Sequence, residues 1–332
     1  MSGNQRAERI RLSLHLPWTI AHGRSLERET ILLHLGEGIG EAAVVPYLGE
    51  SADAIAADLS SADWRIGDQT RIDSDTFGSA LPRTSGAACA VDIARHDQVG
   101  RMLDRPVWDL LGLPAPRPMP TSISIPIDDP DRMAARAKAI DAAVIKVKVG
   151  GEHDEEAIEA IRGATQAALR LDANGGWSRE RAAHLIPRLT RFGIELIEQP
   201  LPAGDRGGYA WLADQGFGVP IFVDESVASV EEIERVAEHV DGVVIKLRKF
   251  GGIGPAHRGI VAARARGLRV MIGCMIESSV AVTAAAHLGG ICDLFDLDAP
   301  LLIANDPYVG IEYSGSLCSI PNRPGIGVTP RI

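Results

Sequence analysis

The stretch Val144–Gly150 reads VIKVKVG and places two lysines within a run of β-branched residues. On a β-strand, residues two apart share a face, so Lys146 and Lys148 point to one side while Ile145 and Val147 point to the other. Lysine is almost never fully buried without a partner. The stretch therefore predicts either an edge strand with a solvated lysine face or a strand whose polar side opens into an active site.

Short apolar strands recur after this pattern and just before it. Eight are predicted: Thr121–Ile125, Val144–Val149, Ala168–Asp172, Ile194–Glu198, Pro220–Asp224, Gly242–Lys246, Leu268–Ile272 and Leu294–Asp298. Most intervals hold a helical pattern, as in Glu155–Ala167, Ser178–Leu189, Val230–Val240 and Gly254–Arg266. Strands that alternate with helices predict βαβ units and a parallel sheet. Eight such units favour a closed TIM barrel of the α/β class over an open, doubly wound sheet.

Residues 1–112 are predicted to form a separate α+β unit. Ile10–Leu14 and Thr30–Leu35 alternate as strands, and Ser51–Leu59 and Gly86–Leu103 have helical patterns. Gly36–Gly40 (GEGIG) lies between strand signals, which favours a hairpin turn over a phosphate-binding loop. This unit is therefore expected to carry a small sheet and at least two helices.

The proline-rich stretch Leu113–Pro120 (LPAPRPMP) predicts a linker into the barrel, which is assigned residues 113–310. The tail, residues 311–332, has its own Pro/Gly-rich character and is predicted to pack back on the N-terminal unit.

Composition and charge exclude several classes of protein. The chain has 332 residues, 45% hydrophobic and 23% charged, with a net charge of −10. The negative charge argues against nucleic acid or an anionic membrane as a partner. No run of about 18 apolar residues is present, and the N-terminus has no signal-peptide core. The four cysteines lack C-x-x-C spacing, which predicts reduced thiols in a cytoplasmic protein.

Ionisable residues end most of the predicted barrel strands. The third, fourth and fifth strands end with Asp172, Glu198 and Asp224. Active sites of such barrels form at the carboxyl ends of the strands. Three converging carboxylates need a cation to offset their repulsion. Because the set contains only oxygen ligands, it predicts a hard metal, Mg²⁺ before Mn²⁺.

Two lysines flank this predicted metal. Lys148 ends the second strand and Lys246 ends the sixth, and in a ring of eight these strands face each other. A substrate carbonyl or carboxylate on the metal would have its α-carbon between the two amines. One amine could remove an α-proton from one face and the other return a proton to the opposite face. The arrangement predicts 1,1-proton transfer, which is racemisation or epimerisation, through an enolate that the metal stabilises.

Several motifs together resemble the muconate-lactonizing subgroup of the enolase superfamily. They are GEGIGEAAVVPYLGES and AVDIARHDQVGRMLDRPVWDLLG in the N-terminal unit, and KVKVG, LDANGGW, IEQPL, VDES and IKLRKFGGI in the barrel. The resemblance implies an N-terminal capping domain over a modified (β/α)7β barrel, with one Mg²⁺ per subunit. It also implies that Lys148 and Lys246 are the two bases and that Lys146 lies beside the substrate carboxylate.

The sequence also offers residues for recognising the substrate. Asp296 and Asp298 are expected on one face of the last strand, as a pair of carboxylates awaiting an ammonium group. A D-x-D at this place looks like that of the dipeptide epimerases, where it holds the N-terminal amine. By the same resemblance, Ser122 adds a hydrogen bond. The resemblance also implies that Arg24, in a loop between Trp18 and a strand beginning at Thr30, reaches the side chain of the second residue.

These residues predict a dipeptide epimerase acting on L-Ala-D/L-Glu, with a role in cell-wall peptide metabolism. Epimerisation of other L-Ala-L-X dipeptides is the alternative within this function. An N-acylamino-acid racemase, or a lyase such as an o-succinylbenzoate synthase or cycloisomerase, would leave Asp296 and Asp298 unexplained, because those substrates lack an ammonium group. A non-catalytic protein would leave both lysines and all three carboxylates unexplained. By analogy with related barrels, a homo-oligomer is expected.

Overall fold

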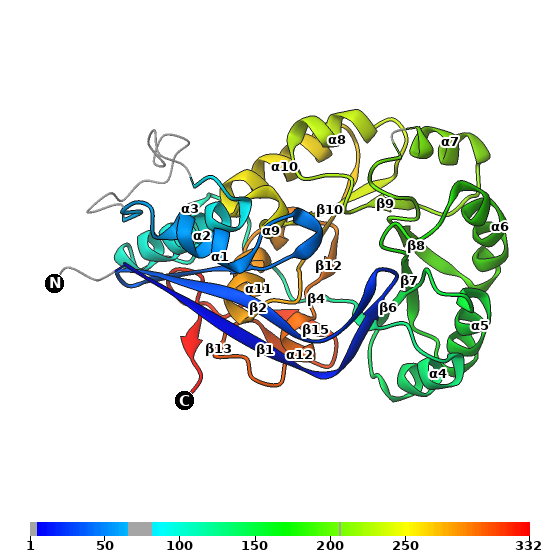
Figure 1. Cartoon of the computed structure of the whole chain (residues 1–332), viewed down its shortest axis with the longest axis horizontal. Coiled ribbons are helices and arrows are strands. Elements are labelled where there is room, and N and C mark those ends of the chain that lie inside the picture. The colour runs from blue at the N-terminus through cyan, green and yellow to red at the C-terminus, as the bar shows by residue number, and fades with distance from the viewer. Residues whose placement is uncertain (1–4, 66–81, 206) are drawn as a thin grey trace.

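The computed structural model describes residues 5–65, 82–205 and 207–332. An N-terminal antiparallel sheet with its helices lies beside a barrel of parallel strands, and the long hairpin of that sheet reaches across to the barrel (Figure 1). This architecture confirms the prediction of an α/β barrel with an α+β unit at the N-terminus. Within the described ranges, no helix is long and apolar enough to cross a membrane.

The N-terminal unit is built on a sheet with the order β1-β2-β3. Its strands are β1 (Gln5–Ile20), β2 (Gly23–Leu35) and β3 (Gly38–Ala43). Its helical elements are η1 (Pro46–Leu48), α1 (Ala52–Leu59), α2 (Ser85–Met102) and α3 (Val107–Leu110). Ile31, Leu33 and Leu35 of β2 pack with apolar residues of α1 and α2 in one buried core. The sheet therefore buries one face against its own helices.

The GEGIG segment forms the turn between β2 and β3, as predicted. Gly36 has a φ of 59°, a left-handed conformation that glycine adopts at little cost. Gly40 faces α2 so closely that an added Cβ would lie 1.9 Å from the carbonyl oxygen of Ala90. The glycines and the alanines of α2 thus allow helix and sheet to pack without side chains between them.

The barrel is a single sheet of eight parallel strands in sequence order. The strands are β5 (Ile123–Ile125), β6 (Val144–Lys148), β7 (Ala168–Asp172), β8 (Ile194–Glu198), β9 (Ile221–Val223), β10 (Gly242–Lys246), β11 (Arg269–Gly273) and β12 (Leu294–Asp296). A parallel bridge between Thr121 and Phe295 joins the two ends of the sheet. The ring is therefore closed, and the open-sheet alternative is excluded.

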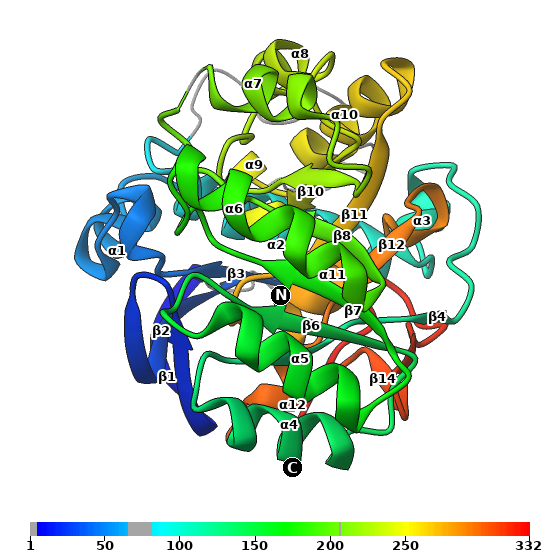
Figure 2. The same ribbon diagram turned by 90° about the vertical axis from the view of Figure 1, so that its right-hand side faces the viewer.

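Helices connect successive strands and cover the outside of the ring (Figure 2). They are α4 (Pro130–Ala139), α5 (Asp154–Ala164), α6 (Arg179–Leu189), α7 (Gly208–Gln215), α8 (Val230–Val236), α10 (Ile253–Ala265) and α11 (Ser279–Ala286). The shorter elements are η2 (Thr190–Phe192), α9 (Leu247–Phe250), η3 (Gly289–Ile291) and α12 (Ala299–Leu302). The order of strands and helices is that of a (β/α)7β barrel.

The interior of the barrel is filled by side chains. Leu196, Phe222, Val244 and Met271 form a buried cluster of their own, separate from the larger core between strands and helices. Each of the first three lies two residues before Glu198, Asp224 or Lys246, so it shares the inward face of its strand one layer deeper. This largely apolar layer, which also contains the buried Arg170, closes the barrel below the residues that end the strands.

The C-terminal tail contributes the short strands β13 (Tyr308–Val309), β14 (Glu312–Ser314), β15 (Leu317–Ser319) and β16 (Thr329–Pro330). β15 pairs with β4 (Met119–Pro120) at the entry to the barrel. The amide of Ile326 donates to Asp97 on α2, and Gly325 exchanges backbone hydrogen bonds with Arg105 and Val107. The tail thus contacts both the barrel entry and the helices of the N-terminal unit.

Buried polar contacts hold the N-terminal unit on the barrel. The Glu41 carboxylate of β3 accepts hydrogen bonds from the Ser278 amide and hydroxyl and from the Ala281 amide, at the start of α11. From α9, the fully buried Arg248 guanidinium donates to Glu50 at 2.6 Å and to the Ala43 carbonyl. These contacts fix the position of the N-terminal unit relative to the carboxyl ends of the barrel strands.

Candidate active site

The carboxyl ends of the strands bring most of the predicted ionisable side chains to one end of the barrel. Lys148 pairs in register with Asp172 across β6 and β7, and Asp172 pairs with Glu198 across β7 and β8. The registers of β10, β11 and β12 set Lys246 and Asp296 level with each other. We call this end of the barrel the mouth.

Lys146 is the most enclosed cation of the site, with 1% of its surface exposed. Its Nζ lies 2.9 Å from Asp172, 2.8 Å from Glu198 and 2.7 Å from Asp296. Burial alone would lower the pKa of Lys146, but the three carboxylates raise it well above the usual value. Lys146 is therefore a charged ammonium at the centre of the acidic cluster.

Lys148 and Lys246 stand on opposite sides of the ring, because three strands separate β6 from β10 in either direction. Lys148 Nζ lies 2.6 Å from Asp172 Oδ2, and Lys246 Nζ lies 2.8 Å from Asp224 Oδ2. Burial alone would lower the pKa of Lys246, but Asp224 together with Tyr47 and Glu198 raises it well above its usual value. Each lysine is thus paired with a different one of the predicted metal ligands.

Asp172, Glu198 and Asp224 are almost fully buried at the mouth. Burial and the neighbouring Asp172 carboxylate raise the pKa of Glu198 to about 8, although Lys146 opposes the shift. Glu198 Oε2 and Asp224 Oδ1 accept no hydrogen bond. A lysine ammonium group lies beside each of these oxygens. Among the described side chains, no group of three Asp, Glu, His or Cys residues is already arranged to hold a metal ion. Buried carboxylate oxygens are suitable ligands for a hard divalent cation such as Mg²⁺, provided that the lysine ammonium groups move away from them.

Two residues that directly follow or adjoin these carboxylates were not singled out from the sequence. Asn174 and Gln199 have φ values of 45° and 41°, the left-handed region that non-glycine residues rarely adopt. The amide of Asn174 donates to Asp172 Oδ1, and Gln199 Oε1 accepts from the amides of Asp224 and Ser226. Strained backbone of this kind concentrates at functional sites. The signal in the sequence was a polar residue two positions after Asp172, in LDAN, and one position after Glu198, in IEQP.

Lys249 was also missed. It is 5% exposed, and its Nζ lies 2.5 Å from Asp224 Oδ1 and 3.1 Å from the Val244 carbonyl. In the sequence it is the second lysine of IKLRK, three residues after Lys246. That spacing places it on α9, from which it reaches back to the same carboxylate.

Asp296 and Asp298 do not share a strand face, contrary to the prediction. β12 ends at Asp296, and Asp298 lies in helical conformation as the N-cap of α12. Asp296 binds Lys146 through Oδ2 and leaves Oδ1 without a hydrogen-bond partner. Asp298 accepts from the Ser124 amide at 2.7 Å, while burial and Asp296 raise its pKa to about 6. Both carboxylates still lie near the mouth, one on the strand and one on the turn that follows.

Ser122 lies deeper in the barrel than predicted. It is fully buried, and its hydroxyl donates to the Phe295 carbonyl and accepts from the Arg170 guanidinium at 3.0 Å. Arg170 lies two residues before Asp172 on the same inward face, so this contact is one layer below the mouth. β5 begins only at Ile123, so Ser122 precedes the strand. This placement gives Ser122 a role in the barrel floor and does not support contact with substrate.

The predicted loop over the mouth is a tight β-hairpin. β1 continues to Ile20 and β2 begins at Gly23, not at Thr30, so Ala21 and His22 alone form the tip. His22 Nε2 donates to the Asn174 carbonyl at 2.6 Å. The Ala21 methyl lies so near the backbone of the β6–α5 and β7–α6 loops that a Cβ on Gly150 would come within 2.8 Å of it. The hairpin tip therefore rests directly on the mouth, beside the end of β6 (Figure 1).

Arg24 lies on the outer face of this hairpin. Trp18 pairs with Ser25, and Thr19 pairs with Arg24. Paired residues share a face and successive residues alternate, so Trp18 and Arg24 point in opposite directions. Trp18 points to the mouth, with its ring centroid 6.0 Å from Lys148 Nζ, whereas Arg24 is exposed. The prediction that Arg24 reaches down to the substrate is therefore not supported.

Two aromatic residues of the N-terminal unit flank the mouth instead. Trp18 is 8% exposed on the Lys148 side. Tyr47, at η1, is 53% exposed and its hydroxyl lies 3.7 Å from Met275 Sδ, in the loop after β11. Met275 follows β11, the strand beside β10, so Tyr47 lies toward the Lys246 side of the mouth. Neither aromatic residue was assigned a role from the sequence.

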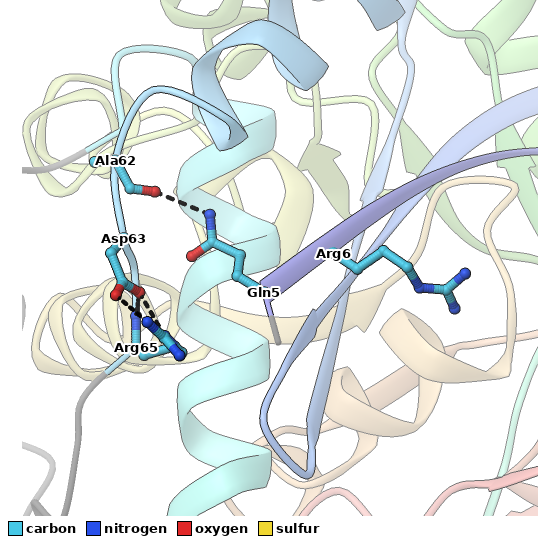
Figure 3. A pocket seen from close by; sticks show the side chains of 5 residues that line it. All are labelled: Gln5, Arg6, Ala62, Asp63 and Arg65. Carbon is cyan, nitrogen blue, oxygen red and sulfur yellow. Dashed lines mark hydrogen bonds and ion pairs between the residues drawn. The ribbon is translucent and has the colours of Figure 1, made fainter. Parts of the chain in front are cut away.

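A surface hollow elsewhere on the N-terminal unit is unrelated to this site (Figure 3). Gln5, Arg6, Ala62, Asp63 and Arg65 line it, at the end of the sheet far from the hairpin tip. Gln5 donates to the Ala62 carbonyl there, and Asp63 pairs with Arg65. The hollow contains none of the residues that meet at the mouth.

Comparisons with known proteins agree with this arrangement. The family described as enolase C-terminal domain-like matches residues 131–331. The L-Ala-D/L-Glu epimerase of Bacteroides thetaiotaomicron is 36% identical over 297 residues, covering 88% of this chain and 77% of that protein. A hydrophobic dipeptide epimerase of Roseobacter litoralis is 38% identical over 253 residues, covering 73% of this chain and 72% of that protein.

A solved structure extends the likeness to the whole chain. The dipeptide epimerase of Enterococcus faecalis, complexed with Mg and L-Leu-L-Tyr, has a TM-score of 0.89 at 27% identity, covering 98% of this chain and 99% of that one. The family model covers more than half of the chain, and relatives above 30% identity span most of it. The chain therefore belongs to the enolase superfamily, in its muconate-lactonizing subgroup with the dipeptide epimerases, and is an isomerase of the racemase and epimerase class.

Proposed function

We propose that the protein inverts the α-carbon of the C-terminal residue of a dipeptide by 1,1-proton transfer between two bases, Lys148 and Lys246. The observation that carries the proposal is their position at the carboxyl ends of β6 and β10, on opposite sides of the closed ring. An α-carbon between them presents one face to each amine. One lysine, neutral at that moment, takes the α-proton, and the other, as ammonium, delivers a proton to the opposite face.

We propose Asp172, Glu198 and Asp224 as the ligands of one Mg²⁺ per subunit. Their burial at the carboxyl ends of three adjacent strands, β7, β8 and β9, supports this assignment. The bound ion would supply Lewis-acid stabilisation of the negative charge that forms when the α-proton leaves. Lys146, already a buried ammonium among the carboxylates, is proposed to meet the same charge on the substrate carboxylate.

The substrate ammonium is assigned to Asp296 and Asp298. Asp296 Oδ1 is buried without a hydrogen-bond donor, and an ammonium group would provide one. The two carboxylates come from the end of β12 and the turn after it, and Asp296 shares Lys146 with Asp172 and Glu198. A dipeptide amine here would separate this function from N-acylamino-acid racemisation and from the lyase reactions, whose substrates lack that group.

Two candidates remain for the second residue of the dipeptide. L-Ala-D/L-Glu is the substrate predicted from the sequence, and the relative from Bacteroides thetaiotaomicron carries that name. Other L-Ala-L-X dipeptides are the second candidate. A specific observation favours the second one, because Arg24, the residue expected to bind the glutamate side chain, lies on the outer face of the hairpin.

The function is tested with a panel of L-Ala-L-X dipeptides and their N-acetylated forms in D₂O with Mg²⁺. Epimerisation is followed by polarimetry, and exchange of the α-proton is followed by NMR. We expect epimerisation and exchange at the C-terminal α-carbon of dipeptides, with little reaction of the N-acetylated forms. Turnover of N-acetylated substrates alone would assign an N-acylamino-acid racemase, and elimination without epimerisation would assign a lyase.

The reaction is proposed to take place in the cytoplasm, and all four cysteines are free thiols in the structure, which fits a reducing compartment.

A further inference from the structure

We propose that the second residue of the dipeptide is apolar and that its side chain lies against Trp18, on the inner face of the β1–β2 hairpin. This inference rests on the proposed function, because it assumes that the α-carbon lies between Lys148 and Lys246. It replaces an acidic side chain with an apolar or aromatic one as the preferred substrate class.

The direction of the second side chain follows from what fills the barrel. Below the ionisable residues, Leu196, Phe222, Val244 and Met271 close the interior. With the substrate carboxylate at the carboxylate cluster and its amine toward β12, the remaining substituent of the α-carbon must point out of the barrel. It therefore points toward the N-terminal unit, whose hairpin tip rests on the mouth.

The surface that it meets there is apolar. Trp18 has its ring over Lys148 and belongs to a buried cluster with Leu12, Leu14 and Ile303. Ile20 and Ile276 are partly buried and pack against this cluster. Burying an apolar side chain against such a surface is favourable, roughly in proportion to the area removed from water.

Near the hairpin tip, the cations of the described chain are turned away or already have a partner. Lys148, beside the Trp18 ring, is paired with Asp172. Arg28, which pairs with Leu12, lies further from the tip and donates to the Glu27 carbonyl. Arg24 is exposed on the opposite face of the hairpin. Arg248 is fully buried and occupied by Glu50 and the Ala43 carbonyl, and Lys249 is occupied by Asp224. A carboxylate placed against Trp18 would have to compete with Asp172 for Lys148, or would lose its hydration without an ion pair, which is costly.

Wild-type kcat/KM values for L-Ala-L-Leu, L-Ala-L-Phe and L-Ala-L-Glu test the inference. We expect both apolar dipeptides to exceed L-Ala-L-Glu by about tenfold or more, the discrimination that a few methylene groups in an apolar site can give. If L-Ala-L-Glu equals or exceeds them, the inference is overturned while the epimerase function stands. If no dipeptide epimerises or exchanges its α-proton, the proposed function fails and this inference fails with it.

A residue exchange provides the sharper test. The double variant Arg24→Ser, Ser25→Arg keeps composition and charge but moves the guanidinium from the outer face to the face of Trp18. We expect kcat/KM for L-Ala-L-Glu to rise by about tenfold, the effect of one charge-assisted hydrogen bond, with L-Ala-L-Leu changed much less. Arg24→Ser alone should alter neither substrate. A loss of L-Ala-L-Glu turnover in Arg24→Ser would overturn the inference.

Trp18 itself is tested with Trp18→Leu, which keeps an apolar side chain in the cluster. KM for L-Ala-L-Phe should rise several-fold, while KM for L-Ala-L-Ala, whose side chain is too short to reach the ring, should not. Trp211→Leu on α7 is the matched control. Equal KM changes for both dipeptides would mean that Trp18 supports the hairpin only.

Arg28, which pairs with Leu12 further from the tip, gives the last check. If Arg28→Met removes turnover of L-Ala-L-Glu but spares L-Ala-L-Leu, an acid is recognised there and the inference is overturned.

Discussion

Lys148 Nζ lies 2.6 Å from Asp172 Oδ2, and the two residues are direct register partners on β6 and β7. Asp172 is thus both the ion-pair partner of a proposed base and a proposed metal ligand. A base must be neutral to accept a proton, so this ion pair has to weaken before Lys148 can act. Lys246 and Asp224 form a corresponding ion pair at 2.8 Å on the other side of the ring, although they are not register partners. The two halves of the site are therefore built alike, one base and one carboxylate on each side.

The two bases can be separated by substitution. Lys148→Ala and Lys246→Ala should each abolish epimerisation, because inversion needs a proton donor and a proton acceptor on opposite faces. Each variant should still exchange the α-proton of one epimer in D₂O, and the two variants should retain opposite epimers, as measured by NMR. Lys138→Ala, at an exposed position of α4, is the control. A Lys148 or Lys246 variant with normal epimerisation in both directions would exclude that lysine as a base.

Removing divalent ions should abolish activity, and added Mg²⁺ should restore it. Glu198→Gln should weaken Mg²⁺ binding by about tenfold or more in calorimetry, because it removes a charged ligand from a buried site. Its thermal unfolding without metal should change less, since the substitution also relieves repulsion from Asp172. Glu159→Gln, exposed on α5, should bind Mg²⁺ as the wild type does. Full activity after exhaustive chelation, with no metal by elemental analysis, would contradict the metal assignment.

The substrate amine is tested at the start of α12. Asp298→Asn should raise KM for dipeptides, because a hydrogen bond between charged groups contributes about 1.5–3 kcal/mol. The change should be much smaller for an N-acetylated substrate, which carries no ammonium. Asp131→Asn, at an exposed position of α4, controls for loss of charge alone. An equal loss with both substrates would mean that Asp298 acts through the Ser124 amide and supports the fold.

A buried histidine should make stability depend on pH. His287 Nδ1 accepts from the Trp108 amide and Nε2 donates to the Ile326 carbonyl, so it joins the barrel to α3 and the tail. Burial lowers the pKa of His287 from 6.5 to about 4. The unfolded chain therefore binds a proton between these values that the folded chain does not. The free energy of unfolding should fall as pH drops from 6.5 to 4, by up to about 3 kcal/mol from this group.

Urea unfolding at a series of pH values checks this expectation. His287→Gln should be less stable than the wild type at pH 7, and the difference between them should shrink toward pH 4. His184→Gln, exposed on α6, should keep the pH dependence of the wild type. A constant difference between His287→Gln and the wild type across this range would show that His287 does not titrate on unfolding.

Much of this protein could be predicted from its sequence, because the signals are local. Alternation within Val144–Lys148 put both lysines on one face, and the structure has both pointing into the barrel. The ends of the strands at Asp172, Glu198 and Lys246 were predicted to the residue. A strand changes from apolar to polar where it leaves the core, and that change is visible in one stretch of chain.

The errors arose where a residue's direction depends on a second segment. Arg24 faces outward because the hairpin register pairs it with Thr19, and a register is a property of two strands. Asp298 left the strand face because α12 begins there and the chain turns. Ser122 is occupied by Arg170 from a strand that is not its neighbour, which no local pattern reveals.

By itself, the sequence determined the barrel, the strand ends and the kinds of side chain at the mouth. Hydrophobic periodicity is a property of successive residues, so it can be recognised without the fold. Only the tertiary structure decided which charges meet and which surface lies above them. Lys146 binds three carboxylates from β7, β8 and β12, and Trp18 comes from another part of the chain to cover Lys148. Ion pairing and packing depend on distances through space, and these are fixed only when the ring closes and the hairpin comes to rest on it.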